Sequence, residues 1–277
     1  MAKISSRIFL VSLCFSPSLW AAVPPTSLSP DALRQNLANA LAVPLTQIVE
    51  AKAYRIDGKG AVTGFVLGRY RQATQAFTFP VLSVYYACDA GTCQASLRLG
   101  QAAERLAPLV LVDLDAPLRS VGRLEPVWFD GGAWQAASAP RVPVLLVASD
   151  VQGKEPSASG RGVSDLSEGT RSEHLLHVIS LATPNAPTLL YRGTLYERWP
   201  DRAEDRARPP RRVGRRIESL SIGKSGSEHL LVISERDQDS RFSRGLRPSP
   251  ESQTLRLQDG RFQPVAPASG PALLPGP

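Results

Sequence analysis

Two short apolar segments of nearly the same sequence constrain the fold most strongly. Residues 172–180 read SEHLLHVIS and residues 227–234 read SEHLLVIS, so the first copy has one extra residue, His177. Each copy holds a short, continuous run of leucine, valine and isoleucine, which is typical of a β-strand buried on both faces. The sequence therefore predicts two copies of a central strand, as layered sheets and propellers contain.

The same two segments also raise the question of a metal site, because each begins with a Glu-His pair. The first copy matches neither H-E-x-x-H nor H-x-x-E-H, and residues three apart on a strand point to opposite faces. We therefore expect a polar pair at the start of each strand and no bound metal. The sequence leaves open whether Glu173-His174 and Glu228-His229 meet in the fold.

Turn signals divide most of the chain into short segments. The chain has 24 prolines and 21 glycines, and long helical periodicities are few. The predicted fold class is mainly β, with repeated hairpins in a propeller-like or sandwich arrangement, one N-terminal helix and a disulfide-stapled hairpin. Asp-Gly is the strongest short signal for a hairpin turn. Such turns are predicted at Asp57-Gly58, Asp130-Gly131 and Asp259-Gly260.

The expected helix starts after residue 29. Ser29 suits the N-cap and Pro30 the first helical position. Leucines at intervals of four then form one narrow apolar stripe, and a stripe of this width is expected to dock on a sheet. These leucines are Leu33, Leu37 and Leu41, and Pro44 ends the helical pattern.

Two cysteines are expected to staple a hairpin. Cys88 and Cys93 lie at the ends of two strand-like runs that flank Asp89-Ala90-Gly91-Thr92. A hairpin with this four-residue loop places them directly opposite each other, close enough to bond. The spacing is not that of a C-x-x-C redox pair, and a zinc site needs more ligands. A structural disulfide formed in an oxidising compartment is the prediction.

The N-terminus is typical of a cleaved signal peptide. Lys3 and Arg7 precede a short apolar run at residues 8–15, and Ala21 closes a cleavage site. No later apolar run is long enough to span a bilayer, so we expect no membrane span in the mature chain. The expected location is periplasmic, cell-surface or extracellular. The expected division is a signal peptide (1–21), a helix with the stapled sheet (22–115), a β-hairpin repeat region with long polar loops (116–266) and a disordered Pro-rich tail (267–277).

Within that repeat region, an arginine-rich run is the most unusual feature. From residue 206 to residue 216 its charges are all basic, which would suit phosphate or carboxylate polymers. The alternative is a solvated loop without a function. The polyanion hypothesis assigns binding to Arg206, Arg208, Arg211, Arg212, Arg215 and Arg216.

Patterns that resemble catalytic motifs are incomplete. The segment around Ser164 lacks the final glycine of G-x-S-x-G, and the segment at 223–227 lacks the first glycine of a phosphate loop, which predicts a turn. Asp113 and Asp115 would share one strand face, as paired carboxylates can, but acids at a strand end before a proline are usually solvated. We expect no catalytic residue, no metal and no cofactor.

The preferred function is therefore that of an exported, non-catalytic binding or interaction protein of unknown ligand. Its partner could be an anionic polymer or another component of the cell envelope. One alternative is a secreted hydrolase that acts on glycan or ester bonds, which requires a pocket where carboxylates, or a histidine and a serine, converge. The other is polyanion binding through residues 206–216.

Overall fold

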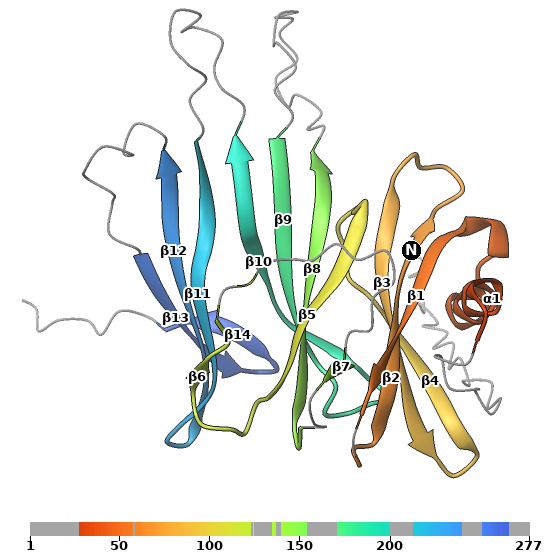
Figure 1. Cartoon of the computed structure of the whole chain (residues 1–277), viewed down its shortest axis with the longest axis horizontal. Helices are drawn as coiled ribbons and strands as arrows, with labels where there is room; N and C mark the ends of the chain where they lie inside the picture. The colour runs from red at the N-terminus through yellow and green to blue at the C-terminus, as the bar shows by residue number, and fades with distance from the viewer. Residues whose placement is uncertain are drawn as a thin grey trace, which may run out of the picture.

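The computed structural model describes residues 28–57, 59–122, 124, 135–136, 140–153, 171–199, 213–239 and 251–265. Within these ranges the chain forms one α-helix, one short 3-10 helix (η2, Leu45–Gln47) and two β-sheets that lie side by side (Figure 1). The predicted mainly β fold with an N-terminal helix is therefore confirmed.

The first sheet, sheet A, has the strand order β4-β3-β2-β1-β7. Strands β1 to β4 are antiparallel to their neighbours, whereas β7 runs parallel to β1. Its strands are β1 (Ile48–Ile56), β2 (Val62–Arg71), β3 (Thr78–Cys88), β4 (Gly91–Arg98) and β7 (Gln135–Ala136).

The second sheet, sheet B, has the order β14-β13-β12-β11-β10-β9-β8-β5, and β6 pairs with β11 beside this path. Consecutive antiparallel hairpins build it as an open sheet rather than a closed ring of blades. Of the two predicted arrangements, the structure therefore supports the sandwich and not the propeller. The strands are β5 (Arg105–Asp113), β6 (Arg119–Ser120), β8 (Pro143–Gly153), β9 (Arg171–Ser180), β10 (Thr188–Trp199), β11 (Val213–Ser225), β12 (Glu228–Asp239), β13 (Glu251–Gln258) and β14 (Arg261–Pro264).

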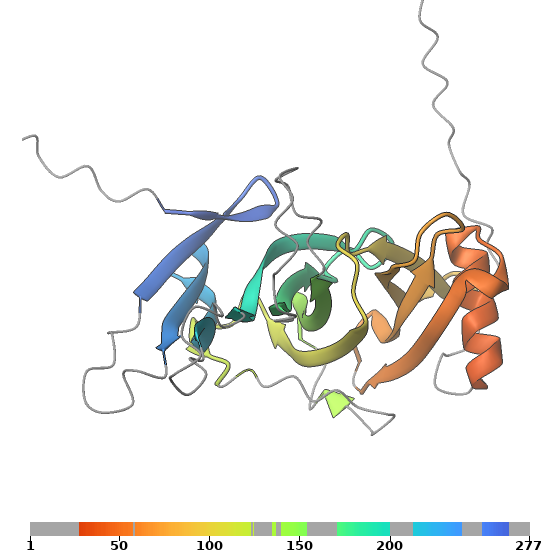
Figure 2. The same ribbon diagram turned by 90° about the horizontal axis from the view of Figure 1, so that it is seen from above.

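Helix α1 (Pro30–Leu41) covers the outer face of sheet A (Figure 2). Ser29 caps it, since its hydroxyl accepts a hydrogen bond from the Ala32 N–H at 3.3 Å. The predicted leucine stripe is buried, and Leu37 lies directly over Gly68 of β2, where a Cβ would clash with it. A side chain at residue 68 would therefore push the helix away from the sheet.

Sheet A is buried on both faces, with α1 on one side and sheet B on the other. Along its strands the side chains alternate between the two contacts. Val66, Val81 and Tyr85 pack with the helix, whereas Phe65 and Val84 join the cluster shared with sheet B. The layers are thus helix, sheet and sheet, and the second cluster, which includes Leu145, Val147 and Ile179, joins the two sheets.

The other face of sheet B forms a separate core. Its buried side chains come from strands at both ends of the sheet, from Val112 on β5 to Leu255 on β13 and Phe262 on β14. Strand β14 also contacts β10, although β11, β12 and β13 lie between them in the sheet order. Sheet B is therefore strongly curled around this core.

The two nearly identical segments are both strands, β9 and β12, but only the first is buried on both faces. In β9, Leu176 and Val178 face the inner core of sheet B, and Ile179 faces sheet A. In β12, Leu231 and Ile233 are buried while Leu230 and Val232 are half-exposed. The prediction of full burial is confirmed for the first copy and wrong for the second, because β12 lies beyond the region that sheet A covers.

Two predicted turns are observed. In the β13–β14 hairpin, Asp259 and Gly260 have φ angles of 49° and 74°, as a two-residue type I′ turn requires. The segment at 223–227 turns between β11 and β12, with Gly226 at φ 61°. Gly58 and residues 125–134 lie outside the described ranges, and so does the predicted turn at Asp130-Gly131.

The polar sequence of residues 235–252, which has no periodicity, predicts a surface loop, but its first residues form a strand. Residues 235–239 continue β12 and pair with residues 213–217 of β11. The charged composition did not indicate a strand, but the backbone register pairs position 237 of β12 with position 215 of β11. Likewise β8 extends to Gly153, two residues into the loop that the polar sequence of residues 152–171 predicts.

The disulfide is confirmed, although its register differs from the prediction. Cys88 and Cys93 are bonded with a Cα–Cα distance of 5.9 Å. Cys88 lies opposite Gly91 and Cys93 lies opposite Tyr86, so the cysteines are diagonal rather than directly opposite. The turn is tighter than the sequence suggested, because Gly91 has a φ of 110° that other residues rarely adopt.

We expect this disulfide to be present in the chain that begins at Ala22. Thiol titration of that chain, denatured without reductant, should find no free thiol. Replacing both cysteines by serine should lower the free energy of unfolding by about 2 kcal/mol, because the short loop is no longer constrained in the unfolded chain. Two titratable thiols would contradict the assignment.

No helix within the described ranges is long and apolar enough to pass through a lipid bilayer. The predicted boundary near residue 115 stays a prediction. Strand β5 lies before residue 115 and pairs with β8, which lies after it. Strand β1 also lies before residue 115 and pairs with β7, which lies after it, so strands on the two sides of the boundary pair with each other.

Candidate functional site: a cavity between the two sheets

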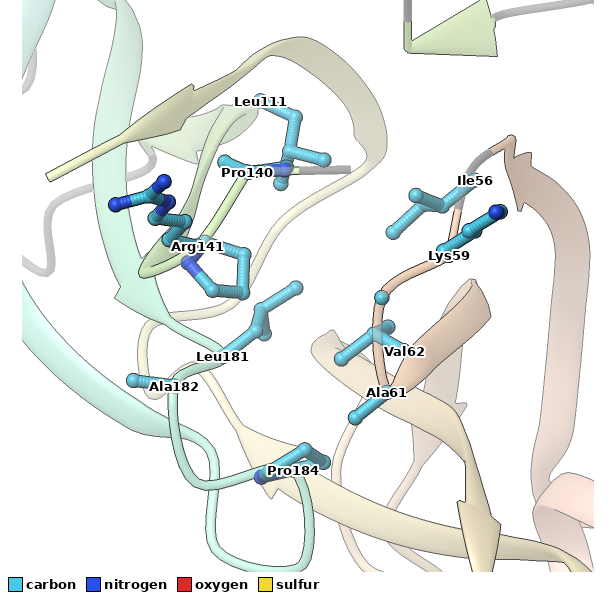
Figure 3. Close-up of a pocket in the computed structure, with 12 residues that line it drawn as sticks. Ile56, Lys59, Ala61, Val62, Leu111, Pro140, Arg141, Leu181, Ala182 and Pro184 are labelled. Carbon is cyan, nitrogen blue, oxygen red and sulfur yellow. The ribbon is translucent and has the colours of Figure 1, made fainter. Parts of the chain in front are cut away.

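A cavity of about 300 Å³ lies where the β1–β2 turn of sheet A meets one edge of sheet B (Figure 3). Sheet A contributes the end of β1 and the start of β2 through Ile56 and Val62. Sheet B contributes Leu111 of β5, the start of β8, and Leu181, which directly follows β9. Because β5, β8 and β9 are antiparallel neighbours, these positions lie close together at one end of the three strands.

The wall of this cavity is mainly apolar. Leu181 is held in place by a 2.8 Å hydrogen bond from its N–H to the carbonyl of Pro143. Prolines at the strand ends add rigid apolar surface without a backbone donor. The apolar lining residues are Ile56, Ala61, Val62, Leu111, Pro140, Pro143, Leu181, Ala182 and Pro184.

Two cations flank the apolar wall. Lys59 comes from the β1–β2 turn and Arg141 from the segment before β8, and Figure 3 shows them on opposite sides of the cavity with their charged ends turned outward. Both side chains are exposed, and neither forms an ion pair with a described residue. Asp113 fixes the backbone beside Arg141 by accepting the N–H groups of Arg141 and Val142.

Most reactive groups are missing from the described lining of the cavity. It contains no carboxylate, histidine, serine or cysteine. Hydrolysis of an ester or glycosidic bond needs a nucleophile or a general acid and base within reach of the bond. The wall can therefore hold an apolar group, and Lys59 is the one described lining side chain that could act as a nucleophile or a base.

The buried histidine of the first repeated segment has a structural partner. His177 Nε2 lies 2.8 Å from Ser149 Oγ, and both residues are at most 1% exposed. Burial, with a smaller effect of Arg192, lowers the pKa of His177 to about 4, so the ring is neutral at pH 7. Although a serine and a histidine meet here, a substrate has no access to them.

A second cluster of polar side chains lies at the end of β8 and β9 that is remote from the cavity. Arg105 Nε and Nη2 donate to the Asp150 carboxylate at 3.0 and 2.6 Å. His174 Nε2 lies 3.5 Å from the other oxygen of Asp150, and its ring lies against Tyr196 with centroids 5.4 Å apart. Burial lowers the pKa of His174, while the Asp150 carboxylate opposes that shift. This row across β5, β8, β9 and β10 is an internal charge network.

The two Glu-His pairs do not meet, because β10 and β11 separate β9 from β12 in sheet B. His229 instead binds Asp115, with 2.7 Å between Nε2 and Oδ1, and this contact chiefly lowers the pKa of Asp115. Among the described residues, no group of three or more His, Cys, Asp or Glu side chains could hold a metal ion. The carboxylates of Asp113 and Asp115 thus have separate partners rather than a common site.

The arginine-rich run is only partly described. Arg215 and Arg216 belong to β11, and the structure places Arg215 between two acidic positions, opposite Glu197 of β10 and opposite Asp237 of β12. Arg216 lies opposite Tyr196. The other predicted polyanion-binding residues lie outside the described ranges, namely Arg206, Arg208, Arg211 and Arg212.

Comparison with known proteins finds no match to a family model, to a curated protein or to a solved structure. The choice of a site therefore rests on geometry. Sequence patterns did not indicate the cavity, because its wall is assembled from four separate parts of the chain, at residues 56–62, 111, 140–143 and 181–184. The sequence signals near it are the predicted turn at Asp57-Gly58 and three prolines close to strand boundaries, Pro140, Pro143 and Pro184.

Proposed function

We propose that this chain is an exported, non-catalytic binding protein and that the cavity between its two sheets is the ligand site. The observation that carries the proposal is the composition of the wall, whose described side chains are mostly apolar and include no carboxylate, histidine, serine or cysteine. Concave, mainly apolar cavities at the junction of two structural layers are typical places for small ligands. The volume lies at the lower end of the usual range, which suits a small molecule.

The disulfide supports the export part of the proposal. A bond between Cys88 and Cys93 is compatible with an oxidising compartment, where such bonds persist. Mass measurement of the protein recovered from its native cells is expected to show a chain that begins at Ala22. A chain that retains residues 1–21 would contradict the predicted signal peptide.

Filling the cavity should abolish binding without unfolding the protein. Ala61 is exposed at the rim, and Figure 3 shows its methyl group directed toward the cavity. We expect 1-octanol to bind the wild-type chain in a calorimetric or NMR titration and to lose at least tenfold in affinity in Ala61→Phe. The control is Ala73→Phe, at an exposed position that is not part of the cavity wall, and it should bind as the wild type does.

The same variants test the hydrolase alternative. If the site only binds, 4-nitrophenyl octanoate should be hydrolysed at the background rate of the buffer in every variant. Saturable hydrolysis that Ala61→Phe abolishes would replace the binding proposal by an esterase. Polyanion binding stays a prediction, because most of its residues lie outside the described ranges and the strand register places acids on both sides of Arg215.

A further inference from the structure

We infer that the ligand of the cavity is a small amphipathic anion, with an apolar body inside the cavity and one anionic group at its mouth. This inference rests on the proposed function, which requires only that the cavity binds a small apolar molecule. The positive charges beside the wall add the requirement that the ligand also carries an anionic group.

The volume of the cavity limits the size of the ligand. At roughly 30 Å³ for each water-sized group, 300 Å³ holds about ten non-hydrogen atoms. An eight-carbon chain with a carboxylate has this size. Ile56, Val62 and Leu181 are at most 5% exposed and form a rigid apolar floor for such a chain.

The sign of the charge at the mouth favours an anion. Lys59 and Arg141 are the charged residues of the described wall, and both are cations. Of the acids near the wall in the chain, Asp57 pairs with Arg55, Asp113 accepts backbone N–H groups, and Asp115 is bound to His229. The Arg141 guanidinium contributes to the lowered pKa of Asp115 from a distance but forms no ion pair with it.

The position of the cations fits a ligand that enters with its apolar end first. Figure 3 shows their charged ends turned away from the cavity on opposite sides, so an anionic group that they contact would lie outside the apolar part of the cavity. Long, flexible lysine and arginine side chains can reach a group at the rim while their methylene stems cover apolar surface. A buried carboxylate would instead lose its hydration without a fixed partner, which is costly.

The inference predicts an order of affinities among three probes of equal chain length. On the full mature chain at low salt, octanoate should bind with a dissociation constant on the order of 0.1–1 mM. 1-Octanol should bind about three- to tenfold more weakly, because exposed ion pairs contribute little each, and octylamine should bind more weakly still. The preference for octanoate should decline at high salt.

The double variant Lys59→Gln, Arg141→Gln should remove the preference for octanoate while 1-octanol binds as before. Both residues are exposed, so the melting temperature should not change. Arg261→Gln, which removes an exposed cation of β14 away from the cavity, is the matched control and should keep the preference.

The outcomes separate this inference from the proposed function. Equal affinity for octanoate and 1-octanol, or a preference that survives in the double variant, overturns the amphipathic anion but leaves an apolar binding site. If neither probe binds the wild-type chain, or if both bind Ala61→Phe unchanged, the cavity is not the site and both proposals are wrong.

Discussion

Leu175→Ala is expected to lower the free energy of unfolding by about 2–4 kcal/mol, whereas Leu230→Ala should cost about 1 kcal/mol or less. The two leucines occupy the same position in the two nearly identical segments. Leu175 is 4% exposed in β9, and its removal leaves a void that the neighbours cannot fill. Leu230 is half-exposed in β12, so its truncation removes little buried surface.

Chemical denaturation followed by circular dichroism measures both losses. The comparison is closely matched, because the same three carbon atoms are removed from almost the same sequence. Leu231→Ala is the positive control, since Leu231 is fully buried and should cost as much as Leu175. Equal losses for Leu175 and Leu230 would mean that the two leucines are buried to the same degree and would contradict the different burial of β9 and β12.

The second large effect is a loss of stability in acid that depends on His177. Its pKa is about 4 in the folded chain, against an ordinary value of 6.5. Between these values the unfolded chain binds a proton that the folded chain does not, so stability falls as the pH falls. Full stability is present above pH 6.5, and His177 should account for a loss of about 3 kcal/mol by pH 4.

His177→Gln tests this effect, because glutamine can still bond to Ser149 but does not titrate. The variant should lose less stability between pH 7 and pH 4 than the wild type, by about 2–3 kcal/mol. The buried ring faces Ser149 and the Arg192 side chain, and neither can stabilise the imidazolium by opposite charge. Identical pH profiles for His177→Gln and the wild type would show that His177 is solvated.

Local features of the fold could be predicted from the sequence because their signals lie within a few residues. Ser29, Pro30 and the leucine stripe define α1, and Asp259-Gly260 defines a two-residue turn. The strand character of both repeated segments follows from their β-branched runs. These elements depend on propensity, capping and turn geometry, which act locally.

Features that depend on distant partners could not be predicted in the same way. The two copies have the same leucines, yet only β9 has sheet A against its second face. The extra residue His177 places Val178 and Ile179 on opposite faces relative to their counterparts Val232 and Ile233. A one-residue change in register exchanges the two faces of a strand, and the sequence alone does not show which face has a neighbour.

The candidate site could not be predicted from the sequence. Lys59 and Leu181 are 122 positions apart and show no pattern that links them. Histidines and paired aspartates, which do resemble sites, turned out to bind Ser149, Asp150 and Asp115 or backbone N–H groups. Chemistry visible in the sequence is used here for internal contacts, while the cavity is formed by residues without a functional signature.

The most direct test of the site is a methyl NMR titration of the mature chain with octanoate. If the ligand lies between the two sheets, chemical shifts should change for methyl groups of both, at Ile56 and Val62 of sheet A and at Leu111 and Leu181 of sheet B. Leu255 and Leu33, in other cores, should not respond. Shift changes confined to one sheet, or centred on those two control residues, would contradict a ligand site at the junction of the sheets.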